Sequence, residues 1–213
     1  MNVISKILNE PSVSRGDYVF DSDHMFFSDY SKRLADTLDE VNWTSVLRLS
    51  NELLATKIRG SRVFLCGNGG SAATASHMTN DLGVSGLGRR GLLSLDMISL
   101  ADNTSVMTAL ANDVGYENVF YEQLRNRLCD NDLVIAFSCS GNSSNVIKAI
   151  KYAKTEGTKV VGVSGFDGGE LMELADINFH VRTEVGDYGL VEDVHMILDH
   201  LIYSYYLQLM SND

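Results

Sequence analysis

Two pairs of acidic and imidazole side chains stand at spacings that place each pair on one face of a helix. His77 and Asp81 are four residues apart in a run of helix-compatible residues. Glu192 and His200 are eight apart in an apolar-rich run, about 80° from one another after two full turns. His195 is about 140° from His200 by the same count and falls outside that stripe. Such groups transfer protons and bind divalent metals, so both pairs are candidates for that chemistry.

Two loops of small residues are candidates for an anion site. The run "VFLC" is followed by "GNGGS" (67–71), and "LVIAFS" is followed by "CSGNSS" (139–144). Ligands of open α/β sheets bind where strands end, and a helix N-terminus adds unpaired N–H groups and a partial positive charge. Glycine permits close approach and serine adds donors, so we expect a phosphate monoester here. The alternative is that Ser71 and Ser143 only cap helices.

The loops and the paired residues need a scaffold, and the order of elements predicts a parallel sheet covered by helices on both faces. Residues 1–23 are predicted to form a loosely structured arm or a short helix, and the apolar spacing over 28–54 predicts one or two amphipathic helices. The predicted strands lie at 62–66, within 91–100, and at 132–138, 159–165 and 176–181. Helices are predicted at 105–113, 117–128, 143–157, 169–174 and 190–209. With no linker in view, we expect one domain.

Bulk composition narrows the function classes. Of 213 residues 45% are apolar, and the formal net charge is −11. An acidic chain is a poor candidate for holding nucleic acid through its phosphates, so we expect no direct nucleic-acid contact. Cys66, Cys129 and Cys139 show no metal or redox spacing, which together with the absence of a signal-like N-terminus predicts reduced thiols and a cytoplasmic protein. No apolar run is long enough to span a membrane.

The segments "CGNGGSAATASH" and "SCSGNSSNVIKAI" resemble the sugar isomerase (SIS) domain family, and with the downstream histidines they resemble its phosphoheptose isomerases, over about residues 34–207. The resemblance implies a three-layer αβα sandwich with a five-stranded parallel sheet of the flavodoxin-like kind. It also implies N-terminal oligomerisation helices and a homotetramer with sugar-phosphate sites between subunits. We expect a single SIS domain over 1–213, divided into an arm (1–23), N-terminal helices (24–58) and an α/β core (59–213).

The resemblance also implies the roles of individual residues. Asn68 would line the sugar, and Ser71, Ser138, Ser140 and Ser143 would hold phosphate. The rest of the expected substrate-binding set is Gly69, Gly70, Asp113, Cys139 and Glu192. Asp113 has an alternative interpretation, because Asn-Asp before a loop is common turn chemistry.

In the resembling isomerases a glutamate base stands where this chain has Asp81, a histidine acid stands at His200, and a glutamine stands at Glu192. Some members bind zinc through these positions and the one at His77, so we expect one zinc ion per subunit on His77, Asp81, Glu192 and His200. Asp81 is shorter than glutamate by about 1.5 Å. The family's arginine aligns with Ser85, near Arg89 and Arg90. Each position also has a structural alternative. His77 could face solvent, Asp81 could be an ordinary carboxylate on a polar face, and His200 could be a surface residue paired with Asp199. Glu192 could stand in the first turn of its helix only because the helix dipole favours acids there.

These features together favour a sugar-phosphate aldose–ketose isomerase that converts sedoheptulose 7-phosphate to D-glycero-D-manno-heptose 7-phosphate through an enediol. Asp81 would be the base and His200 the acid. Two other classes remain open: a non-catalytic SIS protein that associates with the bacterial replication initiator DnaA, and a regulatory module that senses a sugar phosphate.

Overall fold

The computed structural model describes residues 21–91 and 93–211. The chain divides into two compact units, one ending at Asp36 and one comprising Thr37–Asp213. Helix α2 (Asp21–Asp39) begins inside the arm predicted for residues 1–23, of which the first twenty lie outside the described residues. In the first unit α2 carries the exposed apolar side chains of Met25, Phe26 and Phe27. The domain boundaries expected from the sequence stay a prediction.

The second unit contains a sheet of five parallel strands, as predicted. They are β1 (Val63–Cys66), β2 (Met97–Ser99), β3 (Leu133–Ser138), β4 (Lys159–Phe166) and β5 (Ile177–Arg182). Their order is β2-β1-β3-β4-β5, and every neighbouring pair is parallel. This is the flavodoxin-like order, in which the chain reverses its direction of winding between β1 and β3. Every residue of β1 and β3 is buried, as expected for central strands covered on both faces.

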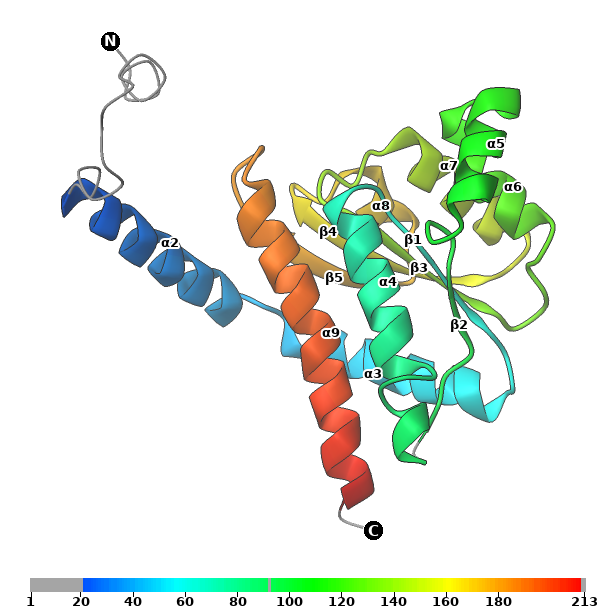
Figure 1. Ribbon diagram of the computed structural model, residues 1–213, viewed down its shortest axis with the longest axis horizontal. Helices are drawn as coiled ribbons and strands as arrows, with labels where there is room; N and C mark the ends of the chain where they lie inside the picture. Colours follow the sequence, from blue (N-terminus) through cyan, green and yellow to red (C-terminus); the bar gives the residue numbers. More distant parts are fainter. Residues whose placement is uncertain (1–20, 92, 212–213) are drawn as a thin grey trace, which may run out of the picture. The chain divides into compact units, whose positions relative to one another are not determined.

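Helices cover both faces of the sheet (Figure 1). On one face, α5 (Thr104–Val114), α6 (Val119–Arg125), α7 (Ser144–Thr155) and α8 (Gly169–Leu174) pack against alternate strand residues such as Phe64 and Val134. On the other face lie α3 (Trp43–Ile58), α4 (Gly70–Leu82) and α9 (Tyr188–Ser211), and α4 contacts α9 directly. This contact brings together the two helices that carry the paired acidic and imidazole residues.

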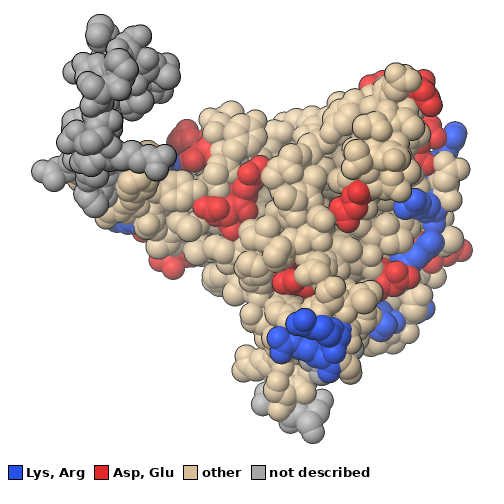
Figure 2. Space-filling model, viewed as in Figure 1, with Lys and Arg blue, Asp and Glu red and all other residues tan. Residues whose placement is uncertain are grey.

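The surface agrees with the acidic composition. On the face drawn in Figure 2 the acidic side chains are scattered rather than gathered in one patch.

None of the described helices has the length and apolar character that crossing a membrane requires. Among the cysteines, all three are free, and Cys66 and Cys139 are buried.

Candidate active site

The two small-residue loops meet at the point where the sheet reverses its winding. One follows β1 and leads into α4, and the other follows β3 and leads into α7. Because β1 and β3 are neighbours in the sheet, their carboxyl ends lie at the position where ligands of this topology bind. Gly141 shapes the second loop: its φ is +62°, and a Cβ there would meet the carbonyl oxygen of Gly168 at 1.9 Å. Only glycine fits that position.

A pair of asparagines joins the loops. Asn68 and Asn145 exchange side-chain hydrogen bonds of 2.9 and 2.8 Å. The hydroxyl of Tyr116 donates to the same side-chain oxygen (Oδ1) of Asn68 at 2.8 Å. The Asn68 amide is therefore fixed by residues that follow β3 and α5. Sequence reasoning missed Asn145 and Tyr116, although Asn145 lies within the quoted "SCSGNSSN" motif and Tyr116 follows the predicted helix at 105–113.

The loop serines are not used as helix caps. Ser143 is the N-cap residue of α7, yet its side chain makes no capping bond and its Oγ lies 3.1 Å from the Oγ of Ser138. Ser71 lies in the first turn of α4, and its Oγ is 3.9 Å from the Cys139 sulfur. Ser140 accepts a bond from the backbone N–H of Asn142. Ser138, Ser140 and Ser143 thus lie on the loop that leads into α7, whose unpaired N–H groups favour an anion, and Ser71 lies next to that loop at Cys139.

The side chain of Glu192, which belongs to α9, packs against the start of α4. A Cβ on Gly70 would fall 2.3 Å from the Glu192 carboxylate, so the absence of a side chain at Gly70 makes room for that group. One carboxylate oxygen of Glu192 is 4.0 Å from the Cys139 sulfur. Burial raises the pKa of the Cys139 thiol, which keeps it protonated at neutral pH and excludes it as a ready nucleophile.

Two turns further along α4 lies a cluster of two imidazoles and two carboxylates. The Nε2 atoms of His77 and His200 are 3.2 Å apart, and the Nε2 atom of His77 is 3.5 Å from an oxygen of Asp81 and 3.9 Å from an oxygen of Asp199. The other oxygen of Asp81 accepts a bond from the Asn80 amide at 2.8 Å. One ligand atom from each of the four residues lies within 4.8 Å of the other three. His77 therefore faces the cluster, in contrast to the solvent-facing alternative.

Asp199 differs from its neighbours in burial. Its side chain is 0% exposed, whereas those of Asp81 and His77 are 18% and 42% exposed. Neither carboxylate oxygen of Asp199 has a hydrogen-bond partner. Burial raises the pKa of Asp199 to about 7, and the nearby charge of Asp81 adds to the rise. An unpartnered buried carboxylate is costly, so a ligand that supplies positive charge would relieve it.

The cluster fits a divalent metal. In a tetrahedral zinc site with bonds of about 2.0 Å, the ligand atoms stand about 3.3 Å apart. The separations of 3.2 and 3.5 Å from the His77 Nε2 atom match that value. Two imidazole nitrogens and two carboxylate oxygens are ordinary zinc ligands, and with neutral imidazoles their charge balances that of a divalent ion.

The structure brings together most, but not all, of the residues singled out from the sequence. His77, Asp81 and His200 meet, but the fourth member of their group is Asp199 and not the predicted Glu192. Sequence reasoning missed Asp199, which shares the apolar run with His200.

Other residues weighed in the sequence analysis lie elsewhere, among them His195, which was expected to fall outside the site. Asp113 lies exposed in the last turn of α5 and accepts a bond from Asn112, so its site role stays a prediction. Ser85 follows α4 in an exposed turn, and the exposed Arg89 and Arg90 belong to a 3-10 turn, η1 (Gly88–Arg90). His195 lies in the core, where its Nε2 atom is 3.2 Å from the carbonyl oxygen of Ser164.

Comparisons with known proteins agree with this geometry. The SIS domain model matches residues 26–165. The phosphoheptose isomerase of Aliarcobacter butzleri is 41% identical over 156 residues, which cover 73% of this chain and 80% of that protein. That of Helicobacter pylori is 39% identical over 151 residues, which cover 70% and 76%. The solved structure of a phosphoheptose isomerase from Neisseria gonorrhoeae superposes with a TM-score of 0.78 at 25% identity, covering 89% of this chain and 100% of that one.

Proposed function

The chain belongs to the SIS domain family and to its phosphoheptose isomerase branch, and we propose that it isomerises sedoheptulose 7-phosphate to D-glycero-D-manno-heptose 7-phosphate. The observation that carries the proposal is the placement of an acid–base cluster at a fixed distance from two serine-rich loops. Ser71 precedes His77 by six residues, or about 9 Å along the axis of α4. A linear seven-carbon sugar phosphate spans a similar length. Its phosphate would therefore lie at the serine loops while its reacting carbons lie at the acid–base cluster.

In this proposal the loops hold the phosphate. The hydroxyls of Ser71, Ser138, Ser140 and Ser143 and the first N–H groups of α7 donate to its oxygens. Neutral donors suit a monoester, because neither loop carries the lysine that nucleoside triphosphate loops use. Asn68, held by its bonds to Asn145 and Tyr116, would present its amide to the sugar.

At the other end Asp81 and His200 would move the protons. Asp81 is partly exposed and is oriented by Asn80, so it would take a proton from C1 of the ketose. His200 would donate a proton to the carbonyl oxygen at C2, which yields the enediol; with its Nε2 atom holding the metal ion, that proton would come from Nδ1. Asp81 then returns its proton to C2 and the hydroxyl at C1 gives its proton to His200, which completes the aldose and restores both side chains.

His77, Asp81 and His200 would belong to a metal centre, for which zinc is the ion that fits the donors. A bound zinc ion would polarise a substrate oxygen and stabilise the charge that develops on it. The positions of His77 and His200 support this assignment, because their Nε2 atoms face each other at ligand spacing.

The activity can be tested directly. Purified protein is incubated with sedoheptulose 7-phosphate and with hexose and pentose phosphates in deuterated water, and NMR follows deuterium entry at C1 and C2. We expect exchange with the heptose phosphate, and a loss of about 100-fold or more in kcat for Asp81→Asn and His200→Ala. Asp130→Asn, in an exposed turn before β3, is the matched control. If the wild type binds sugar phosphate without exchange, the sensing class replaces the enzyme, and if it does neither, the initiator-associating class does.

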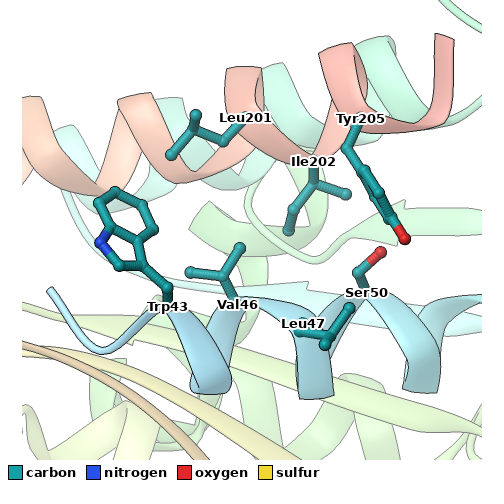
Figure 3. A pocket seen from close by; sticks show the side chains of 7 residues that line it. All are labelled: Trp43, Val46, Leu47, Ser50, Leu201, Ile202 and Tyr205. Atoms are coloured by element: carbon teal, nitrogen blue, oxygen red, sulfur yellow. The ribbon is translucent and has the colours of Figure 1, made fainter. Parts of the chain in front are cut away.

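The proposal includes a homotetramer. An apolar groove of about 230 Å³ lies between α3 and α9, lined by Trp43, Leu47, Leu201 and Tyr205 among others (Figure 3). Trp43 and Leu47 are about half exposed, which is unusual for large apolar side chains that line one groove. A second copy of the chain would cover this surface. Light scattering should report a tetramer at micromolar concentration, and a stable monomer would contradict this part of the proposal.

A further inference from the structure

We propose that Asp199 is a ligand of the metal ion, so that a buried aspartate on α9 takes the place that the family resemblance gives to Glu192. The inference rests on the metal centre of the proposed function and assigns its fourth ligand. The Asp199 carboxylate is fully buried, and neither of its oxygens has a hydrogen-bond partner within the described residues.

The register of the two helices separates Glu192 from the cluster. On α4, Gly70 and His77 are seven residues apart, and on α9, Glu192 and Asp199 are also seven residues apart. Glu192 meets Gly70, and Asp199 meets His77. The two helices therefore run in the same direction, and the two contacts lie about 10 Å apart along their axes. Glu192 therefore lies beside the loop at the start of α4, and Asp199 lies at the cluster about two turns further along.

The angular positions on α9 favour the same assignment. Seven residues turn the helix by about 700°, so Asp199 projects from the face that also carries Glu192 and points toward α4. His200 is the next residue and reaches the cluster from the edge of that face, where it is exposed. Adjacent residues thus supply one buried oxygen and one accessible nitrogen to the same point.

The different exposure of Asp199 and Asp81 gives the two aspartates different roles in this proposal. Asp199 cannot meet substrate, since its side chain has no exposed surface, but its oxygen 3.9 Å from the His77 Nε2 atom is close to ligand spacing. Asp81 is partly exposed and remains the carboxylate that can reach a substrate carbon. With Asp199 among the ligands, a proton can be taken up by Asp81 without the ion losing its last anionic donor.

Zinc affinity is the direct test. The metal-free protein is titrated with Zn²⁺ against a chromophoric chelator. We expect Asp199→Asn to weaken Zn²⁺ binding by more than about 100-fold, because the loss of even an outer partner of a ligand costs about 10- to 100-fold. Glu192→Gln is the matched control on the same helix, and its Zn²⁺ affinity should stay within about threefold of the wild type. Loss of affinity in Glu192→Gln with wild-type affinity in Asp199→Asn would overturn the assignment and keep the metal centre.

A second measurement separates a ligand from a structural residue. In EDTA, Asp199→Leu should unfold at the same temperature as the wild type or a few degrees higher, because it removes two buried oxygens without partners. A clear fall in the midpoint would instead show a structural role and overturn the proposal. If the wild type binds no Zn²⁺, the metal centre and this ligand both fail, while deuterium exchange into the heptose phosphate still tests the isomerase by itself.

Discussion

Acidification should lower the free energy of unfolding of the protein, because His195, on the same helix as His200, is buried in its neutral form. This residue of α9 is fully buried, with its ring against Phe137 and Phe179, its Nε2–H donating to the carbonyl oxygen of Ser164, and its Nδ1 without a partner. Burial lowers its pKa to about 4, from an ordinary value near 6.5. Between about pH 6.5 and pH 4, His195 is therefore protonated in the unfolded chain but not in the folded chain.

The size of the effect follows from the two pKa values. The His195 contribution is fully present above about pH 6.5 and is lost as the pH falls toward 4, at about 1.4 kcal/mol for each pH unit. Between about pH 7.5 and pH 5 the free energy of unfolding should fall by about 2 kcal/mol from this residue. Asp199 acts in the opposite sense, because its raised pKa lets the folded chain bind a proton first as the pH falls.

A variant isolates the His195 contribution from the rest. His195→Gln places an amide N–H near the position of Nε2 and does not titrate. Urea unfolding in EDTA at one protein concentration, followed by circular dichroism, gives the free energy of unfolding at each pH. The wild type should lose about 2 kcal/mol more than the variant between about pH 7.5 and pH 5. Equal losses in the two proteins would refute the reasoning, because they would show that His195 protonates at the same pH in the folded and unfolded chains.

Two predictions concern the loop that follows β1. Gly70→Ala places a methyl group on the Glu192 carboxylate, so we expect kcat/KM to fall by about 10-fold while stability stays within about 1 kcal/mol; an unchanged kcat/KM would contradict the crowding. Tyr116→Phe removes the donor to Asn68, which should lower kcat/KM by about 3- to 10-fold and leave the urea midpoint unchanged; a shifted midpoint with normal kcat/KM would make Tyr116 a structural residue.

The sheet is predictable because its signals are local. Short apolar runs ending in glycine or serine mark buried strands whatever surrounds them, and the alternation with helices implies parallel pairing. Both anion loops are found for the same reason, since each is a contiguous motif. The strand within 91–100 is located less sharply: β2 is only Met97–Ser99, an edge strand whose short pattern does not mark its ends.

The parts of the site that the sequence does not predict depend on tertiary contacts. The helix count places Asp199 in line with Glu192 on α9, but an aspartate in an apolar run is equally typical of a surface position. Only its contact with His77, 122 positions earlier in the chain, shows that it is buried and unpartnered. Tyr116 and Asn145 likewise gain a role only when the loops that follow β1 and β3 meet.

The short side chain at position 81 and the buried carboxylate of Asp199 belong to the same cluster. Asp81 is one methylene shorter than the glutamate of the resembling isomerases, and the Asp199 carboxylate lies 3.9 Å from His77 in the same cluster. A longer side chain at position 81 would reach toward the same point, where two buried carboxylates without a cation would repel each other. The shorter Asp81 thus fits a centre in which the buried carboxylate comes from α9. In the proposed mechanism Asp81, the partly exposed carboxylate, is then the one left to exchange a proton with the sugar.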